Sequence, residues 1–195
     1  LIVRILLLLT VSLLWLSGCA YQNSSAPQGS WQAQKNTLEQ LEQWQLTARL
    51  GIITKDDRGS LSLFWRQNHA NYRMNLTNVV GKRVFDISQT PPLAVTLIDS
   101  DGKTHNAENA RDLVYSLTGW DLPVEQLSYW IKGLPGKADS VTYDDNGRPK
   151  TIQSHGWQLR YAGYTQINGL WLPSGLELNH ENTTLKLAIS EWELN

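Results

Sequence analysis

Few of the 195 residues in this chain are of a type that carries out covalent or acid–base chemistry in a recognisable pattern. The one cysteine, Cys19, follows Leu16-Ser17-Gly18 and is the only candidate thiol nucleophile. No phosphate-cradling glycine loop and no G-x-S-x-G nucleophile elbow occurs in the sequence. The four histidines lie far apart and in no metal-ligand spacing, so we expect neither a metal site nor a cofactor: His69, His105, His155 and His180.

Adjacent acidic residues occur at Asp56-Asp57 and Asp144-Asp145, in segments that we expect to be hairpin turns. Aspartate is favoured in turns because its side chain bonds to nearby backbone amides. A glycosidase-like pair of carboxylates is the alternative interpretation, and nothing else in the sequence supports it. We therefore expect a protein that is not an enzyme; an anchored hydrolase acting on lipid or cell wall would need a nucleophile–base pair that is not evident.

The segment before Cys19 has the pattern of a secretory signal. Arg4 is its only charge, and an apolar run too short for a comfortable membrane span extends from Ile5 to Leu16. The small residues followed by cysteine resemble the lipobox of bacterial lipoproteins. This resemblance implies a diacylglyceryl thioether on Cys19, cleavage before it and acylation of the new amino terminus. Residues 1–18 would then be a signal peptide; a core helix with an incidental cysteine is the alternative.

The rest of the chain has the composition of one domain on a tether. Residues 20–30 are polar, small and uncharged, so residues 19–30 are predicted to be a lipidated, flexible tether and residues 31–195 a single domain. Without Arg4, 16 basic residues (17 − 1) face 18 acidic ones, which predicts no nucleic-acid partner. With Cys19 lipidated, no cysteine remains for a disulfide bond, so the core alone must stabilise the fold.

The periodicity of apolar residues predicts a mainly β fold with helices. Helical spacing over residues 31–43 indicates a short amphipathic helix that either packs on a sheet or binds a partner. Two further helices are expected from Asn106 or Ala107 to Leu117, and from Asp121 or Pro123 to a stop at Gly133. Alternating residues joined by short polar turns predict about ten or eleven antiparallel strands, near residues 44–52, 60–65, 72–77, 85–87, 93–97, 103–105, 141–143, 151–153, 157–162, 176–179 and 185–190.

Each of these strands has one apolar face, so the sheet must close on itself or be covered by its helices. The inward positions are also candidates for lining a cavity: Leu50, Leu63, Trp65, Met74, Leu76 and Phe85.

Two adjacent valines occupy an unusual place. Val79 and Val80 fall at an expected hairpin tip, where polar residues are usual, and Gly81, Lys82 and Arg83 follow them. They form either an exposed apolar finger with a basic base or a tip that folds back and buries both side chains.

Several motifs together resemble the LolB family of outer-membrane lipoprotein receptors. The resemblance spans almost the whole chain after Cys19 and rests on Phe64-Trp65-x-Gln67, Tyr72-Arg73-x-x-Leu76-Thr77-Asn78-x-Val80-Gly81, Leu117-Thr118-Gly119 with Pro123, Leu127-x-x-Trp130-Ile131-x-Gly133-Leu134-Pro135-Gly136, Trp157-x-Leu159-x-Tyr161-x-Gly163-Tyr164 and Leu185-Lys186-Leu187. It implies an antiparallel, unclosed β-barrel of about eleven strands, with an apolar, acyl-chain-binding cavity lidded by helices.

The resemblance also implies what the protein does. It would be a monomer, anchored at the periplasmic face of the outer membrane, that takes triacylated lipoproteins from the soluble carrier LolA and inserts them into outer-membrane lipid. Val80, with Val79 beside it, occupies the loop position where other members carry a membrane-inserting leucine. Ala20, in place of an aspartate after Cys19, is consistent with the outer membrane. The alternative function is a lipoprotein scaffold of envelope assembly that binds proteins and no lipid.

Overall fold

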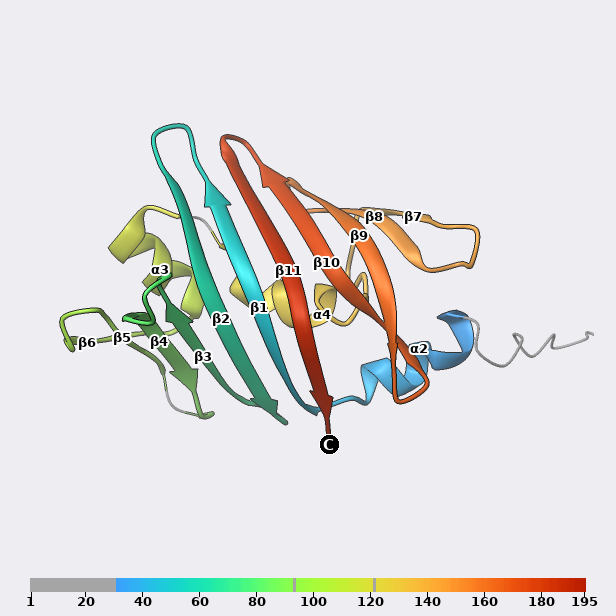
Figure 1. The fold of residues 1–195 in the computed structure, drawn as a ribbon, viewed down its shortest axis with the longest axis horizontal. Helices are drawn as coiled ribbons and strands as arrows, with labels where there is room; N and C mark the ends of the chain where they lie inside the picture. Colours follow the sequence, from blue (N-terminus) through green and yellow to red (C-terminus); the bar gives the residue numbers. More distant parts are fainter. Residues whose placement is uncertain (1–30, 93, 121) are drawn as a thin grey trace, which may run out of the picture.

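The computed structural model describes residues 31–92, 94–120 and 122–195. The predicted signal peptide, Cys19 and the tether lie outside these residues. Within them, every strand belongs to one antiparallel sheet of eleven strands, ordered β6-β5-β4-β3-β2-β1-β11-β10-β9-β8-β7 (Figure 1). The end strands β6 and β7 do not pair with each other, so the sheet is unclosed. The predicted mainly β, unclosed architecture with helices is confirmed.

The elements follow one another along the chain as α2 (Trp31–Glu39), β1 (Gln43–Ile53), β2 (Arg58–Asn68), β3 (Asn71–Thr77), β4 (Arg83–Gln89), β5 (Val95–Ile98), β6 (Thr104–Ala107), α3 (Ala110–Thr118), α4 (Val124–Trp130), β7 (Ser140–Tyr143), β8 (Pro149–Ser154), β9 (Trp157–Ile167), β10 (Leu170–His180) and β11 (Thr183–Leu194).

The two long strands at the ends of the chain, β1 and β11, lie side by side in the middle of the sheet. Leu46 of β1 pairs with Trp192 of β11 on one side and with Trp65 of β2 on the other. The apolar residues of these strands alternate with polar ones, so a single face of the sheet is apolar. Because this face cannot be left in water, it is where the core forms.

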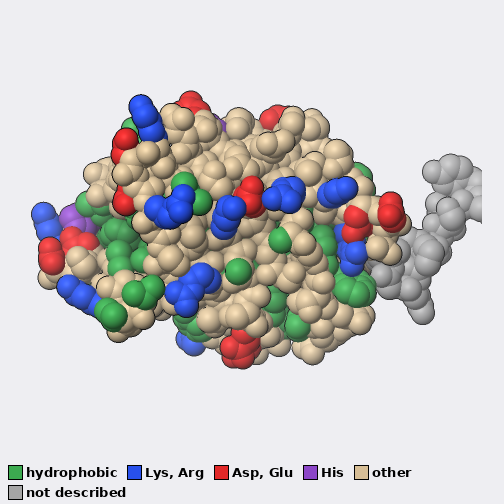
Figure 2. Space-filling view, turned by 45° about the horizontal axis from the view of Figure 1, so that its top comes forward, with side chains coloured by type: hydrophobic (Ala, Val, Ile, Leu, Met, Phe, Trp, Pro, Cys, Tyr) green, Lys and Arg blue, Asp and Glu red, His purple; other side chains and the backbone are tan. Residues whose placement is uncertain are grey.

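Helices α3 and α4 lie behind the sheet in Figure 1, against its apolar face. Leu113 and Val114 of α3 and Val124 and Trp130 of α4 join the strand residues in one buried core. The opposite face of the sheet is exposed, and Figure 2 shows Lys and Arg side chains in a row across it. The sheet therefore has a solvated outer face and an inner face covered by helices.

The helices are shorter than the sequence pattern predicted. The helix expected from Asn106 or Ala107 begins at Ala110, because the residues before it form β6. Asn109 is its N-cap and accepts a hydrogen bond from the Asp112 amide, while Gly119 ends it with a φ of 72°. The second helix begins at Val124 rather than at Asp121 or Pro123. The first, expected over residues 31–43, ends at Glu39.

Helix α2 packs on the sheet, which decides between the two interpretations of its amphipathic pattern. Trp31 and Leu38 are buried, and so is the polar Gln34, with 7% of its surface exposed. The Gln34 amide joins the helix to β10 by two hydrogen bonds. Nε2 donates to the Trp171 carbonyl oxygen at 3.2 Å, and Oε1 accepts from the Trp171 amide at 2.7 Å.

We expect Gln34→Ala to lower the free energy of unfolding by about 1–3 kcal/mol, because it leaves the Trp171 amide and carbonyl without their partner. Gln32→Ala, at an exposed position of the same helix, is the matched control and should change stability by no more than about 0.5 kcal/mol. Urea denaturation of both variants measures the difference. Equal midpoints for the two variants would contradict this role of Gln34.

Candidate functional site

The turn between β3 and β4 is closed by the backbone and side chain of Asn78. The Asn78 carbonyl oxygen accepts from the Gly81 amide at 3.0 Å, and the Asn78 amide donates to the Lys82 carbonyl oxygen at 2.9 Å. The Asn78 side-chain oxygen accepts from the amides of Val80 at 3.1 Å and Lys82 at 3.0 Å. Asn78 therefore provides the hydrogen bonds that close the turn. The side chains of the tip residues, Val79 and Val80, take no part in them.

This arrangement leaves both tip valines in water. Val79 is 75% exposed and Val80 82% exposed, so the tip does not fold back to bury them. The left-handed backbone conformation, which β-branched residues avoid, falls on Gly81, with a φ of 82°. Two valines therefore fit the turn without strain, and they form the exposed apolar finger that was one of the two interpretations of the sequence.

Two other hairpins have the same turn and serve as internal comparisons. At the β5–β6 turn, the Asp99 side chain accepts from the Asp101 and Lys103 amides, and the positive φ falls on Gly102. Asp144, Asn146, Gly147 and Arg148 repeat the pattern at the β7–β8 turn. The tip residues at those turns are Ser100-Asp101 and Asp145-Asn146. The turn geometry is thus compatible with polar tips, and it does not require Val79-Val80.

The hairpin that carries the valines is braced at its middle by an ion pair. Arg73 of β3 donates from Nε to Asp86 Oδ1 of β4 at 2.9 Å, and its Nη2 bonds to the other carboxylate oxygen. The Asp86 side chain is only 4% exposed, and hydrogen bonding to it raises the pKa of Arg73. A bidentate pair fixes two strands in one relative position, so the tip projects from a rigid base.

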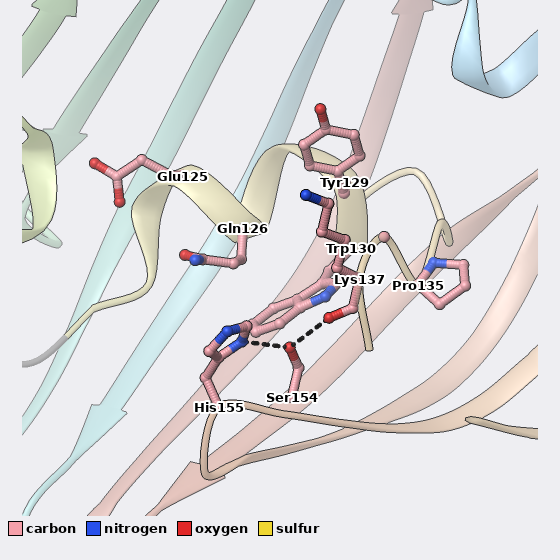
Figure 3. Close-up of a pocket in the computed structure, with 9 residues that line it drawn as sticks. Glu125, Gln126, Tyr129, Trp130, Pro135, Lys137, Ser154 and His155 are labelled. Carbon is pink, nitrogen blue, oxygen red and sulfur yellow. Dashed lines mark hydrogen bonds between the residues drawn. The ribbon is translucent and has the colours of Figure 1, made fainter. Parts of the chain in front are cut away.

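A second feature is an apolar hollow of about 410 Å³ between α4 and the β8–β9 turn (Figure 3). Its walls include the Tyr129 and Trp130 rings, the Pro135 side chain, and Ser154 and His155 from the end of β8 and the turn after it. Ser154 Oγ bonds to His155 Nδ1 at 2.9 Å and to the Lys137 carbonyl oxygen at 3.5 Å, so its hydroxyl is fully paired. The full lining is Glu125, Gln126, Tyr129, Trp130, Pro135, Gly136, Lys137, Ser154 and His155.

The six residues predicted to line a cavity belong to the hydrophobic core, and none of them lines the apolar hollow. Leu50, Leu63, Trp65, Met74 and Leu76 are buried, and Phe85 is partly buried against them. Trp65 is a special case, because its buried indole Nε1 has no hydrogen-bond partner among the described residues. An N–H in that position favours a ligand or water that brings an acceptor.

The wall of the apolar hollow is held by a tyrosine of β9. Tyr161 Oη donates to the Trp130 carbonyl oxygen at 2.8 Å and so ties the end of α4 to the sheet. Burial raises the pKa of Tyr161 well above its usual value, so the phenol remains a donor at any physiological pH. Gly133, just after α4, has a φ of 81°, and a Cβ there would lie 3.0 Å from the Trp31 ring. The glycine of the Trp-Ile-Lys-Gly motif is therefore required both by its backbone conformation and by close packing.

Sequence reasoning missed most residues of the apolar hollow. Trp130 and Pro135 stood in a recognised motif without an assigned role, whereas Gln126, Ser154 and His155 carry no local signal. They come together only because the chain between α4 and β8 returns beneath the helix.

Comparison with known proteins decides the family. A family model described as "Outer membrane lipoprotein LolB" matches residues 42–192. The chain belongs to the LolB family. The outer-membrane lipoprotein LolB of Aeromonas salmonicida (strain A449) is 38% identical over 182 residues, which cover 93% of each chain. The LolB protein of Tolumonas auensis is 35% identical and that of Pseudomonas putida (strain GB-1) 32% identical. The family resemblance predicted from the sequence motifs is confirmed.

Solved structures agree on the fold at much lower sequence identity. A LolA superfamily protein from Nitrosomonas europaea superposes with a TM-score of 0.53 at 12% identity, over 83% of this LolB chain and 93% of that chain. A DUF1329 family protein from Desulfovibrio piger has a TM-score of 0.55 at 8% identity, over 82% of this chain and 88% of the other.

Membrane-spanning helices and metal-binding clusters are both absent from residues 31–92, 94–120 and 122–195. No helix among them is both long and apolar enough to cross a membrane. Their His, Asp and Glu side chains do not gather in groups of three or more that could hold a metal ion.

We expect Asn78→Ala to loosen the tip, because it removes the acceptor of two backbone amides. Hydrogen exchange at Val80 and Lys82 should accelerate, with a loss of about 0.5–1.5 kcal/mol in unfolding free energy. Asn78→Asp keeps the acceptor and is the matched control. Aspartate has this role in the β5–β6 and β7–β8 turns, which we call the sister turns. Unchanged exchange in Asn78→Ala, measured by NMR, would show that the side chain does not hold the tip.

Proposed function

We propose that this LolB protein is a lipid-anchored receptor of the outer membrane that accepts triacylated lipoproteins from the carrier LolA and inserts them into the membrane from its periplasmic face. The observation that carries the proposal is the exposed Val79-Val80 tip. The two sister turns place polar residues at the same positions, so closing the turn does not explain the valines. Contact of the tip with an apolar phase, such as the interior of a membrane, explains both valines.

The free energy that the tip gains in a membrane is enough to orient the domain but not to anchor it. Burying one valine side chain stabilises by roughly 1.5–3 kcal/mol, which is too little to anchor a protein. Lys82 and Arg83, both exposed at the base of the tip, add about 1 kcal/mol each near an anionic lipid surface. A domain already held by lipids on Cys19 needs no more than this to turn its tip toward the bilayer.

The apolar hollow supports the lipid-binding part of the proposal. Its volume, about 410 Å³, lies within the range of small-ligand sites. Each buried CH₂ contributes about 0.8 kcal/mol, so exposing a long acyl chain to water costs on the order of 10 kcal/mol. Direct transfer from the hollow of the carrier to that of the receptor avoids this cost. The helices α3 and α4 would have to move outward to admit the remaining chains beside the core residues Leu63 and Leu76.

We expect Val80→Glu to block the last step alone. A carboxylate at the tip opposes contact with lipid, whereas the hollow is untouched. The variant should therefore accept a lipoprotein from LolA at the parental rate and release it into liposomes at least about tenfold more slowly. A two-stage assay, carrier to receptor and then receptor to liposome, measures both rates. If Val80→Glu released its cargo into liposomes at the parental rate, Val80 would not be the membrane-inserting residue.

The sister turns supply the controls for that assay. Replacing Val79-Val80 by Ser-Asp copies the β5–β6 tip and should give a folded hairpin with the same defect as Val80→Glu. Val80→Leu should release cargo at least as fast as the parent. A Ser-Asp tip that inserts cargo normally would favour the alternative, a scaffold that does not use the membrane.

We expect Gln126→Trp to fill the apolar hollow and to weaken binding of a fluorescent fatty acid about tenfold. Gln126 is exposed at the rim, so the melting temperature should hardly change. Gln158→Trp, on the outer face of β9, is the matched control and should bind as the parent does. Equal displacement curves for the two variants would mean that acyl chains bind elsewhere.

A further inference from the structure

A second, polar hollow shares Tyr129 with the apolar hollow. It encloses about 150 Å³ and is lined by residues of the α2–β1 connection, of β2 and of the end of α4. Tyr129 lines both this polar hollow and the apolar hollow of Figure 3. Because the two hollows adjoin at this residue, a molecule with an apolar part and a polar part is the candidate occupant of the pair.

The polar hollow contains a buried ammonium group. Lys132 is only 8% exposed, although lysine is rarely buried without a counter-charge in contact. Its Nζ donates to the Leu41 carbonyl oxygen at 3.1 Å and lies 6.0 Å from the centre of the Tyr129 ring. Burial lowers the pKa of Lys132, and the carboxylates of Glu42 and Glu39 oppose that shift. An ammonium has three N–H donors, and the described residues provide one hydrogen-bond acceptor for them.

The same hollow is lined by an amide whose oxygen lacks a donor. Gln67 donates from Nε2 to the His69 carbonyl oxygen at 2.6 Å, which fixes the orientation of its amide. Its Oε1 is buried and has no hydrogen-bond partner among the described residues. Leaving such an atom unpaired costs about 1–3 kcal/mol, so a ligand that brings an N–H gains by binding here once the Gln67 side chain turns enough to expose its oxygen. At the rim, Glu42 and His69 are paired with each other.

We propose that the polar hollow binds the peptide part of the lipoprotein cargo, at the residues that adjoin the acylated cysteine. A peptide unit offers both groups that the hollow lacks, a carbonyl oxygen for Lys132 Nζ and an N–H for Gln67 Oε1. The acyl chains of the same molecule lie in the apolar hollow, which adjoins the polar one at Tyr129. This assignment rests on the proposed function and extends it from lipid binding to recognition of a lipid joined to a peptide.

The assignment explains why a lipid carrier of this kind would bury polar groups beside an apolar site. A hollow that binds acyl chains alone accepts any fatty acid or phospholipid. Selectivity for a ligand with hydrogen-bonding groups requires partner groups that remain unpaired when the ligand lacks them. Lys132 and Gln67 supply that penalty, and a free fatty acid leaves both groups unused.

The test compares two probes on the full-length, lipidated protein in phosphatidylcholine nanodiscs. Each probe, palmitate or the triacylated lipopeptide Pam3Cys-Ser-Ser-amide, displaces a bound dansyl fatty acid. We expect Lys132→Met and Gln67→Leu each to weaken displacement by the lipopeptide at least about tenfold, while displacement by palmitate changes less than about twofold. The ratio of the two constants is the readout, because a purely structural effect of either substitution weakens both probes together.

Matched controls are Lys55→Met and Gln158→Leu, which make the same replacements at exposed positions away from both hollows, and their ratios should equal that of the parent. If palmitate and lipopeptide lose affinity in parallel in both variants, or neither loses it, the peptide site is refuted while acyl binding stands. If neither probe displaces the dye from the parent, the acyl site itself is wrong and the peptide site falls with it. Should Lys132→Met lose its melting transition, Gln67→Leu alone decides.

Discussion

The structure depends on one constraint, which is that the apolar face of a sheet that never closes must still be kept from water. A closed barrel would bury this face within itself, but β6 and β7 lie at opposite ends of the strand order. Helices α2, α3 and α4 therefore cover it, and they are short, with nine, nine and seven residues. A cover made of short helices leaves margins, and residues of α4 line both hollows. The places that can admit ligand follow from incomplete coverage.

Alternation of apolar and polar residues was enough to predict the sheet, its number of strands and its two internal helices, because the burial of one face repeats along every strand. The limits of the elements were less predictable. The strand predicted near residues 103–105 extends to Ala107, because Asn106 and Ala107, expected to begin a helix, pair instead with Thr96 and Val95 of β5, and pairing between strands is not a local signal. The fate of Val79 and Val80 was also open. It depends on the Asn78 side chain and the position of the one positive φ, which only the folded turn shows.

The residues that we propose to be functional also differ in how far the sequence predicts them. Cys19 and the valine pair stand out in the sequence because their residue types are unusual for their places. Lys132 does not, since a lysine after Trp-Ile looks like an ordinary surface residue, and Gln67 was noted only as part of the Phe64-Trp65-x-Gln67 motif, without a role. Their importance comes from burial and from hydrogen-bonding capacity that the surrounding chain does not fill. Such a mismatch between a group and its environment arises from tertiary packing and has no counterpart in periodicity or motif spacing.

The pairing of β1 with β11 in the middle of the sheet has a consequence for how the protein is made. Trp44 meets Leu194 in this pair, so the centre of the sheet joins residues that are synthesised early with residues that are synthesised late. Until β11 emerges, the first six strands and the strands from β7 to β10 are two separate sheet fragments, each with an open edge. Contacts between such distant segments slow folding, and exposed edges invite pairing with other chains. A chain whose β11 has not yet paired therefore exposes the edges of β1 and β10 and gains from any chaperone that protects them.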